Sequence, residues 1–135
     1  MVKFTGLAAR LPEIEQTIIF RIAAEIGVPV TFLAAIRLAE NGRAGREFGV
    51  LSEEAVTYEA QCRIAALSVR NNTYRFVEKY ERWPIDAATG ALGRTFVDFM
   101  ASRWAPRGVE NDLNDLNAHW PKNVWKYFTE SGVID

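Results

Sequence analysis

The chain has 135 residues, of which 49% are hydrophobic, and its 16 Lys and Arg residues nearly balance its 17 Asp and Glu residues, for a net charge of −1. This length predicts one domain, 1–135, with a hydrophobic core of its own, and the hydrophobic content excludes a disordered chain. The near-zero charge provides no general attraction to nucleic acid or to an anionic membrane, so neither is expected as a partner.

Cys62 and His119 are the only residues of their kinds. One cysteine excludes a disulfide within the chain, and one cysteine with one histidine is too few for a zinc cluster, so we expect no metal and no cofactor. The first residues lack the apolar segment of a signal peptide. No apolar stretch reaches the roughly 18 residues that suggest a membrane span.

The first predicted helix begins at Pro12, a residue favoured at the first helical position, and ends at Gly27. Isoleucine recurs there at every fourth position, at Ile14, Ile18, Ile22 and Ile26. A second helix is predicted from Pro29 to about Glu40. It is apolar on nearly all sides, which is typical of a central, enclosed helix. Asn41-Gly42 ends it, because both residues tolerate the left-handed conformation.

Residues 41–52 read as a loop with a short extended piece at 48–51. A long helical pattern follows over 57–82, and Asn71-Asn72 within it suggests a break, because Asn side chains compete for backbone hydrogen bonds. Trp83-Pro84 ends this helix. Two more helices are predicted, one around 96–104 and one that begins between Asn117 and Pro121 and ends near Ser131. No strand pattern is evident. We therefore expect a compact all-α domain of five to six helices.

Glu40 is the strongest candidate for chemistry. Leu33 and Ile36 share its helix face, so burial should raise the pKa of its carboxyl group, and the negative end of the helix dipole acts in the same direction. Arg37 opposes both effects if it pairs with Glu40. A carboxyl group that stays protonated is what a general acid requires. The alternative is an ordinary solvated glutamate in the last turn of a helix.

The loop that follows Glu40 supports the functional interpretation. Its glycines allow tight turns, and Phe48 and Val50 are apolar residues that something must cover. The strings Ala39-Glu40-Asn41-Gly42 and Phe48-Gly49-Val50-Leu51-Ser52 resemble the lysozyme-like superfamily, most closely soluble lytic transglycosylases and phage muralytic proteins. The stretch 99–106, followed by Glu110-Asn111-Asp112, Asn117, Trp120 and Asn123, is similar to the closing segment of phage-type members. Asn41 and Leu51-Ser52 differ from the Ser and the Met-Gln pair of the transglycosylase pattern, and its Ala-Tyr-Asn-Ala-Gly motif is absent.

The resemblance implies a lysozyme-like fold with an active-site cleft. It also implies a glycosidase that cleaves the β-1,4 bond between N-acetylmuramic acid and N-acetylglucosamine in peptidoglycan. Glu40 would be the general acid/base, glycan strands the partner, and the protein a monomer. Without a signal peptide, we expect a phage virion or the host cytoplasm as its location, with another route to the wall. The alternative is a non-catalytic phage structural or wall-binding module of the same fold.

Hydrolysis commonly uses a second carboxylate. The candidates are Glu47, Glu53, Glu54, Asp86, Asp98 and Asp112, and none stands out. This fits the transglycosylase scheme that the resemblance implies, in which the substrate's own N-acetyl group assists. Expected substrate-binding residues combine aromatic faces, amides and the loop after Glu40, and they are Phe48, Gly49, Val50, Tyr58, Asn72, Asn111 and Asn117. The structural alternatives are a core position for Tyr58 and a helix N-cap for Asn117.

Overall fold

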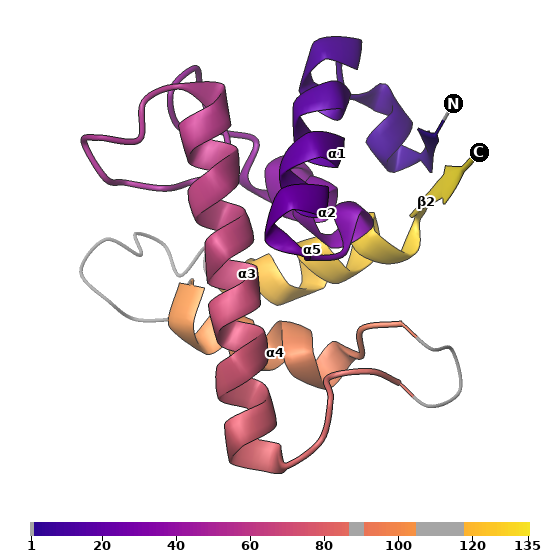
Figure 1. Ribbon diagram of the computed structural model, residues 1–135, viewed down its shortest axis with the longest axis vertical. Helices are drawn as coiled ribbons and strands as arrows, with labels where there is room; N and C mark the ends of the chain where they lie inside the picture. The colour runs from indigo at the N-terminus through magenta and orange to yellow at the C-terminus, as the bar shows by residue number, and fades with distance from the viewer. Residues whose placement is uncertain (1, 87–90, 105–117) are drawn as a thin grey trace.

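The computed structural model describes residues 2–86, 91–104 and 118–135. Five α-helices follow one another along this part of the chain: α1 (Glu13–Ile26), α2 (Val30–Glu40), α3 (Tyr58–Tyr80), α4 (Arg94–Trp104) and α5 (Trp120–Thr129). A short 3-10 helix (Leu7–Arg10) precedes them, and two strands, β1 (Lys3–Gly6) and β2 (Ser131–Ile134), lie at the ends of the chain (Figure 1). The predominantly helical fold is therefore confirmed.

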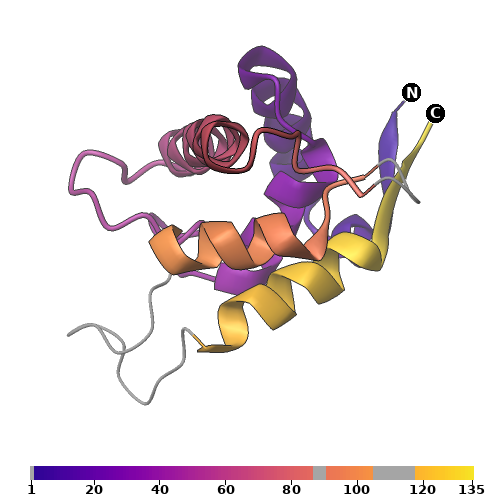
Figure 2. The same ribbon diagram turned by 90° about the horizontal axis from the view of Figure 1, so that it is seen from below.

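Helix α2 lies at the centre of the fold, between α1 and α3 on one side and α5 on the other (Figure 2). Five consecutive residues of α2, Phe32 to Ile36, are fully buried, as its apolar sequence predicts. Phe32 packs on Phe96 of α4 and Phe128 of α5, with ring centroids 5.8 and 5.5 Å apart. These contacts anchor α2 against α4 and α5, the two helices that also supply the residues around Glu40.

The ends of the first two helices follow the predicted signals. The backbone of Gly27, after α1, and of Asn41, after α2, is left-handed, with φ of 85° and 44°. Helix α3, by contrast, runs without the break that Asn71-Asn72 suggested. Asn72 donates its side-chain amide to the carbonyl of Ser68, at 2.8 Å, so the competing bond is made within the helix and does not interrupt it.

The sequence did not predict the sheet. Strand β1 pairs antiparallel with β2, with Phe4 opposite Val133, and joins the two ends of the chain. Strands of four residues are too short to display an alternating pattern, and their pairing depends on contacts between distant parts of the sequence. The extended piece expected at 48–51 is not a strand.

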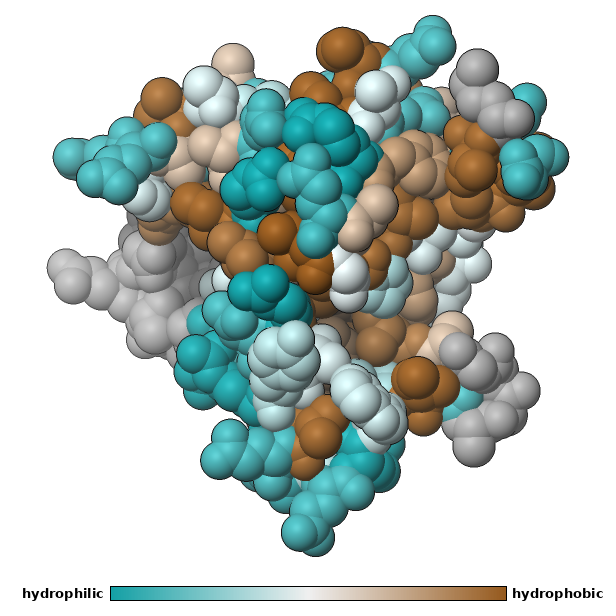
Figure 3. Space-filling view, viewed as in Figure 1, coloured by the Kyte–Doolittle hydropathy of each residue, from teal (hydrophilic) through white to brown (hydrophobic). Residues whose placement is uncertain are grey.

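Charged residues join α1 to α3 on the surface. Arg21 and Arg63 each bond to Glu25 and Glu59, at 2.9–3.5 Å. Hydrophilic residues accordingly cover much of the face formed by these two helices, with hydrophobic residues visible between them (Figure 3). In the described part of the chain, no helix has the length and apolar character that crossing a bilayer requires.

Candidate functional site

Glu40 is the last residue of α2. The left-handed Asn41 ends the helix, and its N–H bonds to the carbonyl of Arg37 at 3.0 Å. Burial decreases along α2, from fully buried residues at Phe32 to Ile36 to half-buried residues from Arg37 onward, and Glu40 keeps part of its surface exposed. The residue thus occupies the boundary between the core and solvent.

Two tryptophans hold the Glu40 carboxyl group. Trp104, at the end of α4, donates its indole N–H to Oε1 at 2.9 Å. Trp120, at the start of α5, donates to the same oxygen at 2.8 Å. The two rings lie 6.4 Å apart, centroid to centroid. These two hydrogen bonds orient the carboxyl group, and both of their donors are uncharged.

Gly49 lies against the other carboxyl oxygen. Its backbone is left-handed, with φ of 73°, and a Cβ at this position would sit 2.2 Å from Oε2 of Glu40. Any larger residue at this position would have to displace the Glu40 carboxyl group. The structure thus brings together two of the predicted site residues, Glu40 and Gly49. Their close approach explains why position 49 is a glycine.

The pKa of Glu40 is raised above its ordinary value of 4.5. Burial is the main cause, and the indole N–H groups of Trp104 and Trp120 act in the opposite direction by stabilising the ionised form. Arg37, which the sequence left as a possible partner of Glu40, bonds instead to Glu15, with Nε 2.8 Å from the carboxylate oxygen. The raised pKa is the property that a general acid needs.

Phe48 and Val50 flank Gly49 in the loop between α2 and α3. Phe48 is fully buried and packs edge-on against Tyr58, with ring centroids 5.3 Å apart. Val50 is half-buried. The side chain of Gln61, also fully buried, bonds to the backbone of both Phe48 and Val50. In the structure Phe48 therefore supports the loop from within the core.

Tyr58 begins α3 and lies beside the Arg37–Glu15 ion pair. The Arg37 guanidinium stands 5.9 Å from its ring centroid. Its hydroxyl oxygen is buried and bonds to none of the described residues, although the Glu15 carboxylate lies near it. Burial, followed by that carboxylate, raises the pKa of Tyr58. The hydroxyl group is thus enclosed, and it makes none of the hydrogen bonds that hold Glu40.

Asn72 lies in the middle of α3 and is buried, and its Oδ1 has no hydrogen-bond partner among the described residues. It makes none of the contacts that hold Glu40. Asn111 and Asn117, the remaining predicted substrate-binding residues, lie outside the described residues.

The structure places the second-carboxylate candidates as follows. Glu47 accepts the N–H of Gly45, and Asp98 pairs with Arg94, at 3.1 and 3.2 Å. Glu53, Glu54 and Asp86 are exposed, and Asp112 lies outside the described residues. None of those described contacts Glu40. Within residues 2–86, 91–104 and 118–135, no group of three His, Cys, Asp or Glu side chains is arranged to hold a metal ion.

The contacts of three residues in the site were not predicted, although Trp104 and Trp120 fall in the part of the sequence that resembles the closing segment of phage-type members. Trp104 and Trp120 lie 64 and 80 positions from Glu40, and their convergence has no local signature. Gln61 did carry a signal, because it falls on the same helical face as the buried Ala65 and Val69. A polar residue on a buried face must find partners, and Gln61 finds them in the loop.

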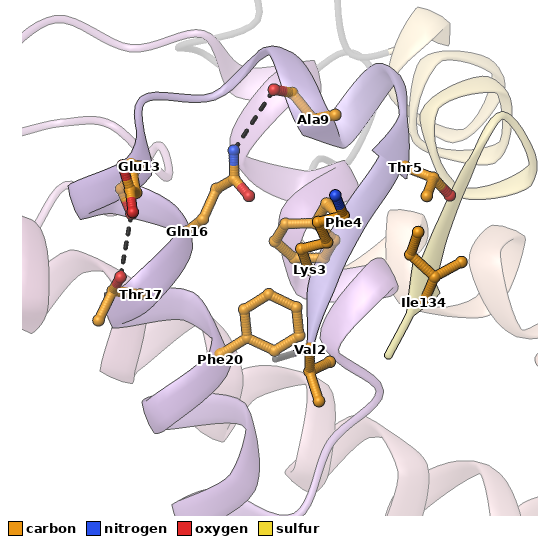
Figure 4. A pocket seen from close by; sticks show the side chains of 10 residues that line it. All are labelled: Val2, Lys3, Phe4, Thr5, Ala9, Glu13, Gln16, Thr17, Phe20 and Ile134. Atoms are coloured by element: carbon orange, nitrogen blue, oxygen red, sulfur yellow. Dashed lines mark hydrogen bonds between the residues drawn. The ribbon is translucent and has the colours of Figure 1, made fainter.

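A separate pocket of about 550 Å³ lies between β1 and α1 (Figure 4). Phe4 and Phe20 stack at its wall, with centroids 4.5 Å apart, and Gln16 closes one side by bonding to the carbonyls of Ala9 and Leu11. Neither Glu40 nor its contact residues line this pocket, so it is not part of the candidate site.

A scan against protein-family models and searches of curated proteins and of solved structures found no match to this chain.

Proposed function

We propose that the protein is a peptidoglycan glycosidase of the lytic transglycosylase or lysozyme type, with Glu40 as its general acid/base. The observation that carries the proposal is the state of this carboxyl group. It is partly buried, its pKa is raised, and it is held in one orientation by Trp104 and Trp120. The resemblance of its sequence surroundings to the lysozyme-like superfamily supplies the substrate class.

The two indole bonds suggest which oxygen carries the proton. Both N–H groups donate to Oε1, so they stabilise negative charge on that oxygen. The proton of the neutral acid is then favoured on Oε2, the oxygen that faces Gly49. In this assignment Oε2 is the atom that protonates the leaving oxygen.

The reaction proceeds in two proton transfers. Glu40 gives its proton to the glycosidic oxygen as the bond to the muramic acid ring breaks, and the substrate's N-acetyl group stabilises the positive charge on that ring. The Glu40 carboxylate then accepts a proton from the C6 hydroxyl group, whose oxygen closes the anhydro ring, and the acid is restored. Water that attacks in place of this hydroxyl group gives the lysozyme product.

The test is Glu40→Gln, which keeps the shape and the acceptor oxygen for the two indoles but carries no acidic proton. We expect the variant to fold and to clear purified cell walls about 10²–10⁴-fold more slowly, the usual contribution of general acid catalysis. Glu81→Gln is the matched control, because Glu81 is an exposed glutamate at the end of α3. Mass spectrometry of the released fragments distinguishes anhydro from hydrolysed products.

Undiminished clearing by Glu40→Gln contradicts the assignment of Glu40. Wild-type protein that binds walls without clearing them contradicts the enzyme and favours the non-catalytic module of the same fold.

A further inference from the structure

The buried side chain of Gln61 uses all of its hydrogen-bonding capacity on one loop. Its Oε1 accepts the N–H groups of Phe48 and Val50, at 3.2 and 3.1 Å. Its Nε2 donates to the carbonyls of Val50 and Ala55, at 2.8 and 2.5 Å. A primary amide has two acceptor sites and two donors, so none is left over. The side chain therefore acts as a fixed connection between the first turn of α3 and the loop over 48–55.

These bonds are arranged around Gly49. Two of them engage the N–H groups on either side of this glycine, and the pair on Val50 takes both its N–H and its carbonyl, as a neighbouring strand would. The opposite orientation of the amide would set its NH2 group against two backbone donors. The network thus admits one arrangement, and it determines where the Gly49 backbone lies.

We infer that Gln61 is the positioning residue that holds Gly49 against the Glu40 carboxyl group. Gln61 itself makes no hydrogen bond to the carboxyl group or to its two indole donors. It acts through the loop, whose glycine has no room for a Cβ beside Oε2. Backbone in this place occupies space that water would otherwise fill.

This arrangement bears on the ionisation of Glu40. Because burial is the main cause of its raised pKa, water admitted by a displaced loop should lower that pKa toward 4.5. Charged neighbours along the described chain are engaged elsewhere. Arg37 pairs with Glu15, Arg46 bonds to the carbonyls of Gly45 and Ala55, and Glu47 accepts the N–H of Gly45. The groups of α4 and α5 that contact the carboxyl are the neutral indoles of Trp104 and Trp120.

A role of Gln61 in catalysis rests on the proposed function, whereas its effect on the pKa of Glu40 does not. The experiment therefore measures the protonation of Glu40 directly. In protein labelled with ¹⁵N-tryptophan, the four indole N–H signals are recorded against pH, and those of Trp104 and Trp120 follow the protonation of the oxygen they bond to. Trp83 and Trp125 are internal references. Glu40→Gln should abolish the titration and so identify its source.

Two variants remove the network. Gln61→Met keeps the length of the side chain and leaves the loop backbone groups without partners. Gln61→Ala leaves a space lined by two N–H and two carbonyl groups, which water can fill, so it is the variant that folds if Gln61→Met does not. Val69→Ala is the control, because Val69 is a fully buried residue two turns further along α3 that makes no side-chain hydrogen bond to the loop.

We expect a lower titration midpoint of the two indole signals in both Gln61 variants and the wild-type midpoint in Val69→Ala. A folded Gln61 variant with the wild-type midpoint overturns the inference. An independent measurement needs no variant. In the wild-type protein the N–H groups of Phe48 and Val50 should exchange with solvent much more slowly than that of the exposed Glu53, and equal rates also overturn the inference. Neither readout depends on activity, so a failure of the proposed function is recognised separately.

Discussion

The Gly49 backbone lies directly against the carboxyl group of Glu40, close enough that a Cβ on the glycine would stand 2.2 Å from Oε2. Glu40 is the last residue of α2 and Gly49 lies in the loop that follows, where its backbone is left-handed. The contact encloses a carboxyl group whose other oxygen is already engaged by Trp104 and Trp120. Ionisation of Glu40, and any chemistry it performs, is consequently sensitive to small displacements here.

Gly49→Ala should displace the carboxyl group and reduce wall clearing by at least tenfold. Gly27→Ala is a matched control, because its φ of 85° imposes similar backbone strain while nothing lies within 4 Å of the added Cβ. Left-handed backbone costs an L-residue about 1–2 kcal/mol, so Gly27→Ala should lose about that much stability in urea unfolding and keep its activity. Gly49→Ala should lose more stability, because it also displaces the Glu40 carboxyl group from its two indole donors, and it should lose activity. Equal activity of the two variants would contradict the role of the Gly49 contact.

Trp104→Phe should raise the pKa of Glu40 further, because it removes an N–H donor that favours the ionised form. The first step of the proposed reaction needs the protonated acid, so the rate of wall clearing falls as pH rises through this pKa. The falling limb should therefore move to higher pH, because a hydrogen bond to a charged group stabilises it by about 1.5–3 kcal/mol. Trp125→Phe serves as the control, and a limb that stays in place or moves to lower pH argues against the assignment.

Glu40→Gln should make the protein more stable at pH 7. A carboxyl group whose folded pKa lies above its unfolded value binds more protons in the folded state, so the free energy of unfolding decreases as pH rises between the two values. Glutamine removes this loss and still accepts the two indole bonds. The gain over wild type should be present at pH 7 and disappear below about pH 4.5, the ordinary pKa of the group. Urea unfolding at both pH values measures it, and the reverse dependence on pH would show that the pKa is lowered.

Tyr58→Phe should leave wall clearing unchanged. The hydroxyl oxygen is buried beside the Arg37–Glu15 pair and bonds to none of the described residues, so removing it takes away no hydrogen bond from them. The free energy of unfolding should stay within about 1 kcal/mol of wild type or increase, because a buried hydroxyl without a partner is itself unfavourable. A marked loss of activity with stability intact would support the prediction that Tyr58 binds substrate.

The sequence was sufficient for features that depend on neighbouring residues. The apolar pattern of 29–40 predicted a buried central helix, and Asn41-Gly42 predicted its end, so Glu40 was expected at the edge of the core. The same local information placed Gly49 in a loop after it. Capping preferences and hydrophobic periodicity act over a few residues, and they can therefore be recognised before the fold is known.

Only the tertiary structure decided which groups surround Glu40. Trp104 and Trp120 are 64 and 80 residues away and reach one oxygen because α4 and α5 both pack near the end of α2. Tertiary packing also brings Arg37 next to Glu15 and places the Gln61 side chain against the loop. It pairs the two ends of the chain as a sheet. These contacts join residues distant in sequence, and their geometry follows from how whole helices fit together, which no local pattern contains.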